Sequence, residues 1–151
     1  GYPELYLAAL SANRQMLQSI RRYVESGGKL LAECGGMMYL CDEIRDKNGY
    51  VYPMAGVLHQ SATMENMKLR LGYRTLLYNE TRLKGHEFHY SRLVEQQNPL
   101  PSCAVAYTAK GVETDTPLYH YKNVWAGYTH LYWADPVGNE WFTKFVIDGN
   151  T

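Results

Sequence analysis

Residues 29–40 read KLLAECGGMMYL, and this stretch decides the fold. Residues 30–32 form a short apolar run typical of a buried strand, and a second apolar run starts at Met37. Cys34 and two glycines lie between the two runs. Because glycine permits a tight turn and close backbone packing, the pattern predicts a strand, a sharp corner at Cys34 and then a helix.

The chemistry of Cys34 has two interpretations. A free cysteine beside a buried strand is usually a packing residue. At a corner between strand and helix, however, it would occupy the position that serine takes as nucleophile in α/β-hydrolases. The free N–H groups and positive dipole end of the following helix would favour the thiolate. We therefore interpret Cys34 as a nucleophile, and Cys41 and Cys103, which lack this context, as ordinary buried thiols.

Composition restricts the classes of function. A chain of 151 residues is long enough for one domain with its own core. Its 15 basic and 15 acidic residues balance, which gives no support for nucleic-acid binding. The sequence shows no signal peptide and no apolar run of membrane-spanning length, so we expect no membrane partner. Three cysteines without framework spacing indicate a reducing compartment, and we expect a cytoplasmic protein.

The sequence opens without methionine, at Gly1, in what reads as a loop entering a helix. We therefore expect a piece of a longer polypeptide. Helical periodicity predicts one amphipathic helix over residues 3–25, ended by two glycines, and a second helix from the corner to about Ile44. The last helix should start at Asp135 and Pro136 and could end at Gly149.

The middle of the chain is rich in strand and turn patterns. Expected strands cover residues 50–52, 68–78, 87–94 and 104–108, with turns at 46–49, 79–80 and 84–85 and a loop at 96–102. Residues 119–121 and 124–128 should form a hairpin around Lys122 and Asn123. Helices, a strand and corner, several strands and a final helix together predict an α/β domain with an antiparallel excursion.

A nucleophilic cysteine needs a base, and the chain has five histidines: His59, His86, His89, His120 and His130. The best placed is His130, because it follows the expected strand 124–128, and the ends of parallel strands form the active-site edge in α/β folds. The alternative for this residue is a hydrogen-bonded core histidine between aromatic neighbours. For two of the other histidines, at positions 59 and 120, the sequence offers no supporting pattern.

The segment GHEFHYS, residues 85–91, contains two further histidines. Their spacing of three in strand-like surroundings does not match the helical zinc motif, in which histidines lie four apart, so we expect no metal site. Strand alternation would place Glu87 and His89 on one face. They could orient a catalytic group or only satisfy each other.

Four motifs, followed by a histidine after an aromatic strand, point to a known family. They are GYPELY at residues 1–6, LLAECGGMMYL at 30–40, LGYR at 71–74 and GHEFHYS at 85–91. In this order and spacing they resemble the C-terminal glutamine amidotransferase domain of cobyrinic acid a,c-diamide synthases, over nearly the whole chain. This domain belongs to the cobyric acid synthase branch of the class I glutamine amidotransferases. The resemblance implies a flavodoxin-like three-layer fold, with its first strands upstream of Gly1.

The resemblance also implies roles for site residues. Cys34 would form a thioester with the side-chain carbonyl of glutamine, and His130 would act as base and then as acid. Backbone N–H groups at Gly1 and Gly35 would form the oxyanion hole.

In the wider class, the third catalytic residue is a glutamate two positions after the histidine, but Tyr132 occupies that position here. The branch that this chain resembles works with a Cys–His pair. Glu87 is therefore the candidate for an orienting carboxylate. His89 and Arg74 are further candidates for orienting or contacting substrate.

Members of the resembled family carry an N-terminal ATP-binding synthetase domain. This chain has no phosphate-loop motif, so the resemblance implies that ATP and Mg bind in that absent domain and that this fragment holds no cofactor. The implied function is to supply ammonia from glutamine, through the synthetase domain, for amidation of the a and c carboxylates of cobyrinic acid, a corrinoid substrate of cobalamin biosynthesis. A homodimer is also expected.

Two alternatives from other classes stay open at this point. The first is another cysteine hydrolase on a similar scaffold, such as a γ-glutamyl hydrolase or a DJ-1-like protein. The second is a binding module that has lost its chemistry.

Overall fold

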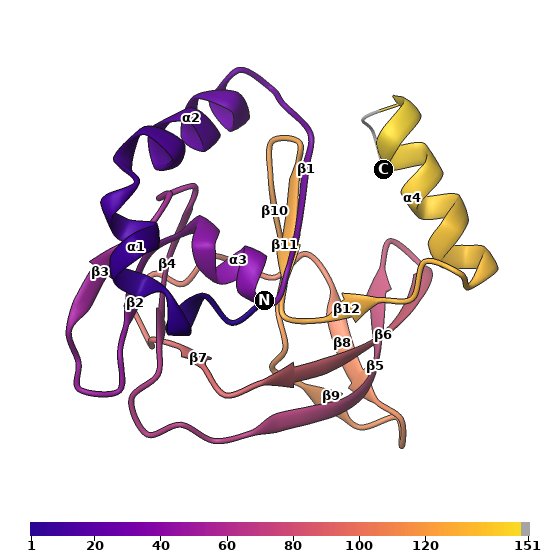
Figure 1. Cartoon of the computed structure of the whole chain (residues 1–151). Coiled ribbons are helices and arrows are strands. Elements are labelled where there is room, and N and C mark those ends of the chain that lie inside the picture. Colours follow the sequence, from indigo (N-terminus) through magenta and orange to yellow (C-terminus); the bar gives the residue numbers. More distant parts are fainter. Residues whose placement is uncertain (149–151) are drawn as a thin grey trace.

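A computed structural model describes residues 1–148 and shows a mixed α/β fold (Figure 1). The N-terminal segment forms a 3₁₀ helix, η1 (Pro3–Leu5), followed by α1 (Leu7–Ala12) and α2 (Arg14–Glu25). The single helix predicted over residues 3–25 is therefore wrong. The chain leaves helical geometry at Asn13 (φ −80°, ψ 64°), whose side chain accepts a hydrogen bond from the Met16 N–H at 3.2 Å and caps α2.

The corner predicted around Cys34 is present. Strand β1 (Leu30–Glu33) leads into α3 (Gly35–Leu40). The second helix ends earlier than predicted, because Cys41–Arg45 forms strand β2. This strand pairs in parallel with β4 (Leu58–Thr63), which the sequence analysis did not identify, and the pairing buries two apolar side chains of β2 that a longer helix would place elsewhere.

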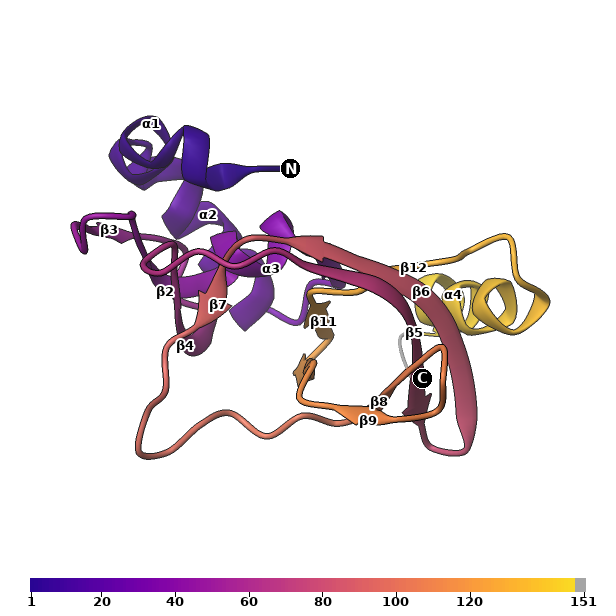
Figure 2. The same ribbon diagram turned by 90° about the horizontal axis from the view of Figure 1, so that it is seen from below.

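The strands form three sheets. Parallel pairing joins β1 to β11 (Val124–Gly127), and β10 (Leu118–Tyr121) continues this sheet in the antiparallel sense. The four-stranded sheet has the order β3-β2-β4-β7, with β3 at Val51–Pro53 and β7 at Arg92–Leu93. The five-stranded sheet has the order β12-β6-β5-β8-β9, with β5 at Arg70–Tyr78, β6 at Thr81–His89, β8 at Val105–Thr108, β9 at Glu113–Thr114 and β12 at His130–Leu131. Figure 2 shows the long β5–β6 ribbon running from the helical part of the molecule toward the last helix, α4 (Pro136–Asp148).

Two turns were predicted in the β5–β6 ribbon, and only one of them is present. Asn79 and Glu80 form the two-residue turn with positive φ values of 43° and 66°, as predicted. The turn predicted at residues 84–85 is wrong, because both residues lie inside β6. Gly85 is needed there for packing, since a Cβ atom would overlap the carbonyl oxygen of His130 in the neighbouring strand β12.

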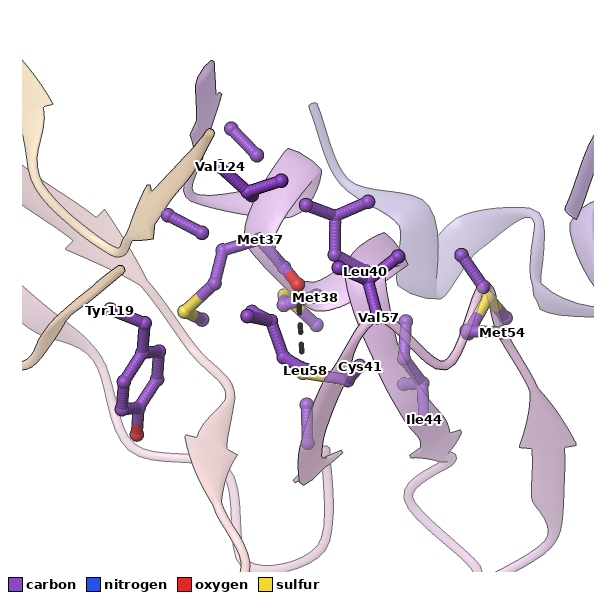
Figure 3. Close-up of a cluster of buried hydrophobic side chains, with 14 of the residues drawn as sticks. Met37, Met38, Leu40, Cys41, Ile44, Met54, Val57, Leu58, Tyr119 and Val124 are labelled. Carbon is purple, nitrogen blue, oxygen red and sulfur yellow. Dashed lines mark hydrogen bonds between the residues drawn. The ribbon is translucent and has the colours of Figure 1, made fainter. Parts of the chain in front are cut away.

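Two hydrophobic clusters stabilise these sheets. The first surrounds α3, where Met37, Leu40 and Ile44 are buried and the Cys41 thiol donates to the Met37 carbonyl at 3.5 Å (Figure 3). The second lies beneath α4. Its centre is Trp125, which makes edge-to-face contacts with Tyr78 at 4.8 Å and Trp141 at 5.3 Å. The cluster around α3 therefore supports the corner that carries Cys34.

The prediction of an α/β domain with an antiparallel excursion is confirmed, as are the hairpin around residues 122–123 and the start of α4 at Pro136. Gly149, the predicted end of α4, lies outside the described residues. No helix within residues 1–148 is long and apolar enough to span a membrane.

The close approach of β6 and β12 gives a testable prediction. Gly85→Ala should lower the free energy of unfolding by about 1–3 kcal/mol, the usual cost of overpacking, because β12 must move away. Urea denaturation measures the change. The matched control is Gly36→Ala, where the added Cβ meets only the Ala32 side chain at an ordinary 3.5 Å. Equal stability of the two variants would contradict the packing described here.

Candidate active site

Cys34 has a backbone conformation that non-glycine residues seldom adopt, with φ 52° and ψ −110°. Residues in such conformations persist only where the surrounding structure holds them, and they concentrate at functional sites. Here the Cys34 N–H donates to the Gly127 carbonyl at 2.8 Å, which extends the β1–β11 pairing by one residue. The corner thus turns the Cys34 side chain out of the sheet at the start of α3.

The Cys34 side chain faces a pocket of about 300 Å³. Four parts of the chain form its walls: the N-terminal segment, the corner with α3, strand β6 with the residues after it, and β12. The lining residues are Gly1, Tyr2, Pro3, Glu4, Cys34, Gly35, Met38, His86, Phe88, His89, Ser91 and His130. The pocket therefore collects the two proposed catalytic residues, both proposed oxyanion-hole residues and His89 from distant parts of the sequence.

The thiol of Cys34 is protonated in the resting site. Burial raises its pKa, which outweighs the hydrogen bond from the Gly35 N–H. The S–H group points to the Phe88 carbonyl at 3.7 Å. The expectation that the start of α3 would favour the thiolate is thus not met, and the chemistry needs a base. Burial also raises the pKa of Cys41 to about 12 and that of Cys103 to about 11.

His130 is suited to be that base. It opens strand β12, where it pairs with His86 of β6, and its ring stacks on the His86 ring with centroids 5.0 Å apart. Burial lowers the pKa of His130, and the electrostatic effect of the neighbouring His86 lowers it further. A lowered pKa means that the imidazole stays neutral, and able to accept a proton, to a lower pH than usual.

The other histidines are distributed as follows. His86 and His89 line the same pocket as His130. His59 is exposed and lies 3.5 Å from the Asp42 carboxylate. His120 stacks on Trp125 with ring centroids 3.9 Å apart. Only the first two can therefore contact a molecule bound beside Cys34.

The carboxylate paired with His130 belongs to Glu33, which directly precedes the nucleophile. Its Oε2 lies 3.9 Å from His130 Nδ1, and its Oε1 accepts a hydrogen bond from the Leu131 N–H at 3.0 Å. Sequence reasoning missed this residue. Its position at the end of β1 could have indicated this role. β1 pairs in parallel with β11, and the chain continues from β11 to β12, which begins with His130.

Glu87, the candidate for the orienting carboxylate, has different partners. Its buried side chain pairs with Arg74, accepts a hydrogen bond from Thr116 at 2.8 Å, and lies 3.3 Å from Nε2 of His89. Glu87 therefore orients His89 and Arg74, and Glu33 takes the place beside His130.

The proposed oxyanion-hole residues meet at the N-terminal segment. A Cβ atom on Gly35 would lie 2.7 Å from Cδ of Pro3 and 3.4 Å from the backbone N of Tyr2, so the segment packs directly on the glycine. Gly1 lines the pocket at the same place. Tyr2 has left-handed geometry with φ 57° and ψ 54°. The backbone nitrogen of Tyr2 is thus close to Gly35, whose own N–H donates a hydrogen bond to the Cys34 sulfur.

No group of three or more His, Cys, Asp and Glu side chains within residues 1–148 is arranged to hold a metal ion. The polar groups that line the pocket beside Cys34 are instead three histidine rings, backbone amides and the Glu4 carboxylate. This set can deprotonate a thiol, bind an oxyanion and return a proton to a leaving group.

Comparison with known proteins places this site in a family. Residues 1–137 match the CobB/CobQ-like glutamine amidotransferase domain. The chain is 37% identical over 138 residues to hydrogenobyrinate a,c-diamide synthase of Stutzerimonas stutzeri, covering 91% of this chain and 31% of the relative. It is 37% identical over 139 residues to cobyrinate a,c-diamide synthase of Caldanaerobacter subterraneus (87% and 30%) and 33% identical over 142 residues to that of Salmonella typhimurium (89% and 31%).

The chain thus spans about a third of the length of these curated relatives. The mixed α/β architecture agrees with the class I glutamine amidotransferase-like fold expected from the sequence. By the match over residues 1–137, the chain belongs to the CobB/CobQ-like family of glutamine amidotransferase domains.

Proposed function

We propose that this domain hydrolyses glutamine at Cys34 and supplies the ammonia with which the protein containing it amidates the a and c carboxylates of cobyrinic acid. The observation that carries the proposal is the single pocket that holds the strained Cys34, the neutral His130 and the backbone amides of the N-terminal segment. The family and the names of the relatives support it.

The first half of the reaction forms a thioester. His130 takes the proton from the Cys34 thiol, and the sulfur attacks the γ-carbonyl carbon of glutamine. The carbon–nitrogen bond then breaks, and His130 returns its proton to the departing nitrogen, which leaves as ammonia. In the second half, His130 takes a proton from water, and hydroxide attack on the thioester releases glutamate and restores the thiol.

Two features of the pocket stabilise the intermediates. Backbone N–H groups at Gly35 and at the N-terminal segment with Gly1, which line the pocket together, would bind the negative charge that develops on the carbonyl oxygen. The carboxylate of Glu33 faces Nδ1 of His130 and is itself fixed by the Leu131 N–H. At 3.9 Å this carboxylate is too far from Nδ1 to accept a hydrogen bond, and its charge would stabilise the imidazolium that forms during the reaction.

The remaining parts of the function lie in the rest of the protein. An ATP- and Mg-dependent synthetase domain would activate the corrinoid carboxylate and receive the ammonia. The share of the relatives' length that this chain leaves uncovered is large enough for such a domain. We also propose a cytoplasmic location and retain the homodimer as a hypothesis.

The first prediction concerns the nucleophile. In the full-length protein, Cys34→Ala should abolish glutamine-dependent amidation and leave ammonia-dependent amidation intact, because free ammonia bypasses the thioester. Product formation with each nitrogen source measures the difference. Cys41→Ala serves as the control and should retain both activities. Equal loss of both activities in Cys34→Ala would mean that the residue is structural.

The second prediction concerns the base. His130→Asn should reduce the glutaminase rate about 10²-fold or more, the scale of general acid–base catalysis. In the wild type, kcat/KM should fall on acidification with an apparent pKa below the ordinary value of 6.5, because burial and His86 favour neutral His130. His86→Asn removes one of these causes and should move the acidic limb to higher pH. An unchanged acidic limb in that variant would contradict this coupling.

A third prediction separates the two carboxylates. Glu33→Gln keeps an oxygen that can accept from the Leu131 N–H but removes the charge beside His130. We expect kcat to fall roughly tenfold or more, a part of the acid–base contribution, with KM little changed and with partial recovery in Glu33→Asp. The exposed Glu80→Gln is the control. A kcat equal to that of the wild type in Glu33→Gln would show that the Glu33 charge does not assist His130.

A further inference from the structure

A second pocket lies directly behind the pocket that holds Cys34. Its volume is about 360 Å³, and its lining includes Arg70 and Tyr128. Two residues, His89 and Ser91, line both pockets. Both are buried, with exposed fractions of 4% and 2%. The two pockets are therefore back to back, and a single layer of side chains forms the wall between them.

The hydroxyl group of Ser91 spans this wall. Its Oγ donates a hydrogen bond at 3.2 Å to Sδ of Met38, which lines the pocket beside Cys34. On the other side, the same Oγ lies 2.9 Å from Oη of Tyr128, which lines the second pocket. Because a thioether sulfur only accepts, the Ser91 hydrogen goes to Met38, and the Tyr128 hydroxyl donates to Ser91. Two hydrogen bonds in series thus connect the two pockets.

The rest of the wall is fixed by its own contacts. Nδ1 of His89 lies 2.8 Å from the Ser91 carbonyl oxygen, which can only accept, so His89 donates there. Nε2 of His89 lies 3.3 Å from the Glu87 carboxylate, which also pairs with Arg74. The His89 ring stacks on the Tyr128 ring with centroids 3.6 Å apart. The backbone of Ser91 and the ring of Tyr128 are therefore held in place, while the Ser91 hydroxyl can still rotate.

The hydrogen bond from Ser91 to Met38 is the weakest part of the wall. A thioether sulfur is a poor acceptor, and the lone pair of an ammonia nitrogen is a better one. Ammonia released beside Met38 can therefore replace the sulfur as the acceptor for Ser91. Rotation of the Ser91 side chain then turns the bound ammonia toward Tyr128 and the second pocket. Ser91 keeps a hydrogen-bond partner during this exchange, which limits its cost.

We propose that the hydroxyl groups of Ser91 and Tyr128 form a gate through which ammonia released at Cys34 enters the second pocket. This inference rests on the proposed glutamine hydrolysis and adds the residues that release its first product. When ammonia forms, the rest of the substrate is still bound to Cys34 as the thioester and occupies the space through which it entered. An exit through the wall lets ammonia leave ahead of glutamate, without contact with solvent, where it would become unreactive ammonium.

The test follows the origin of the nitrogen in the product. The full-length protein receives glutamine with heavy nitrogen in its carboxamide, together with unlabelled ammonium chloride at the same concentration. Mass spectrometry of the amidated product gives the share of nitrogen that came from glutamine, and the amount of amide formed per glutamate gives the coupling. In the wild type, most of the product nitrogen should come from glutamine. Nitrogen drawn mainly from the ammonium salt would overturn the gate.

Ser91→Val and Ser91→Thr form a matched pair, because the two new side chains have the same shape and only threonine keeps the hydroxyl. Ser91→Val should lower the amide formed per glutamate roughly tenfold, the scale of losing a buried hydrogen-bond partner. Most of its product nitrogen should then come from the ammonium salt. Ser91→Thr should stay near the wild type. Glutamine hydrolysis and ammonia-dependent amidation should change little in both variants.

Tyr128→Phe tests the other half of the gate. The substitution removes the hydroxyl and keeps the ring that stacks on His89. We expect less amide per glutamate and a smaller share of glutamine nitrogen in the product. The matched control is Tyr119→Phe, which removes the hydroxyl of a buried tyrosine in strand β10 and should behave as the wild type does.

Full coupling in a folded Ser91→Val variant would overturn the gate. Equal uncoupling in Ser91→Thr would also overturn it, because bulk and not the hydroxyl would then be the cause. An equal loss of ammonia-dependent amidation in Ser91→Val would place the effect in the synthetase reaction and count against the gate. If circular dichroism shows that both Ser91 variants are unfolded, Tyr128→Phe decides: reduced coupling supports the gate, and wild-type coupling overturns it.

Failure of this proposal can be told apart from failure of the proposed function. A wild type that amidates with ammonia but releases no glutamate from glutamine would contradict the proposed function, and the gate would fall with it. A wild type that hydrolyses glutamine, together with full coupling in Ser91→Val, would overturn the gate alone.

Discussion

The hydrogen bond from the Cys34 N–H to the Gly127 carbonyl is the interaction on which the site depends. It fixes the end of β1 against β11 at the residue where the backbone takes its strained turn. A side chain held this way cannot relax back into the sheet. The same strand pair sets the position of His130, because β11 runs on within a few residues to β12. The proposed nucleophile and the proposed base are thus held in place by the same pair of strands.

The electrostatics of the pocket favour an uncharged pair of Cys34 and His130. Burial raises the pKa of Cys34 and lowers that of His130, and both shifts favour the neutral thiol and the neutral imidazole. Oε2 of Glu4, in another wall of the pocket, is buried without a hydrogen-bond partner among the described residues.

The predictable parts of this structure are those encoded by local patterns. The corner at Cys34, the hairpin turn at residues 122–123 and the start of α4 follow from short sequence signals, and all three are present. The failures have tertiary causes. The chain forms β2 directly after α3, where a longer helix was expected, because β2 pairs with β4. Gly85 does not form a turn but allows the close approach of the neighbouring strand β12. The proximity of Glu33 to His130 depends on the alignment of three strands, which no local pattern specifies.

The most direct test of the account is labelling with a glutamine analogue that carries an electrophilic diazoketone in place of the carboxamide. Mass spectrometry of the labelled protein reports which thiol has reacted and in what amount. The account predicts one label per chain, confined to Cys34, with loss of glutaminase activity in proportion to labelling and protection by glutamine. Label on Cys41 or Cys103, or full activity after Cys34 is labelled, would contradict it.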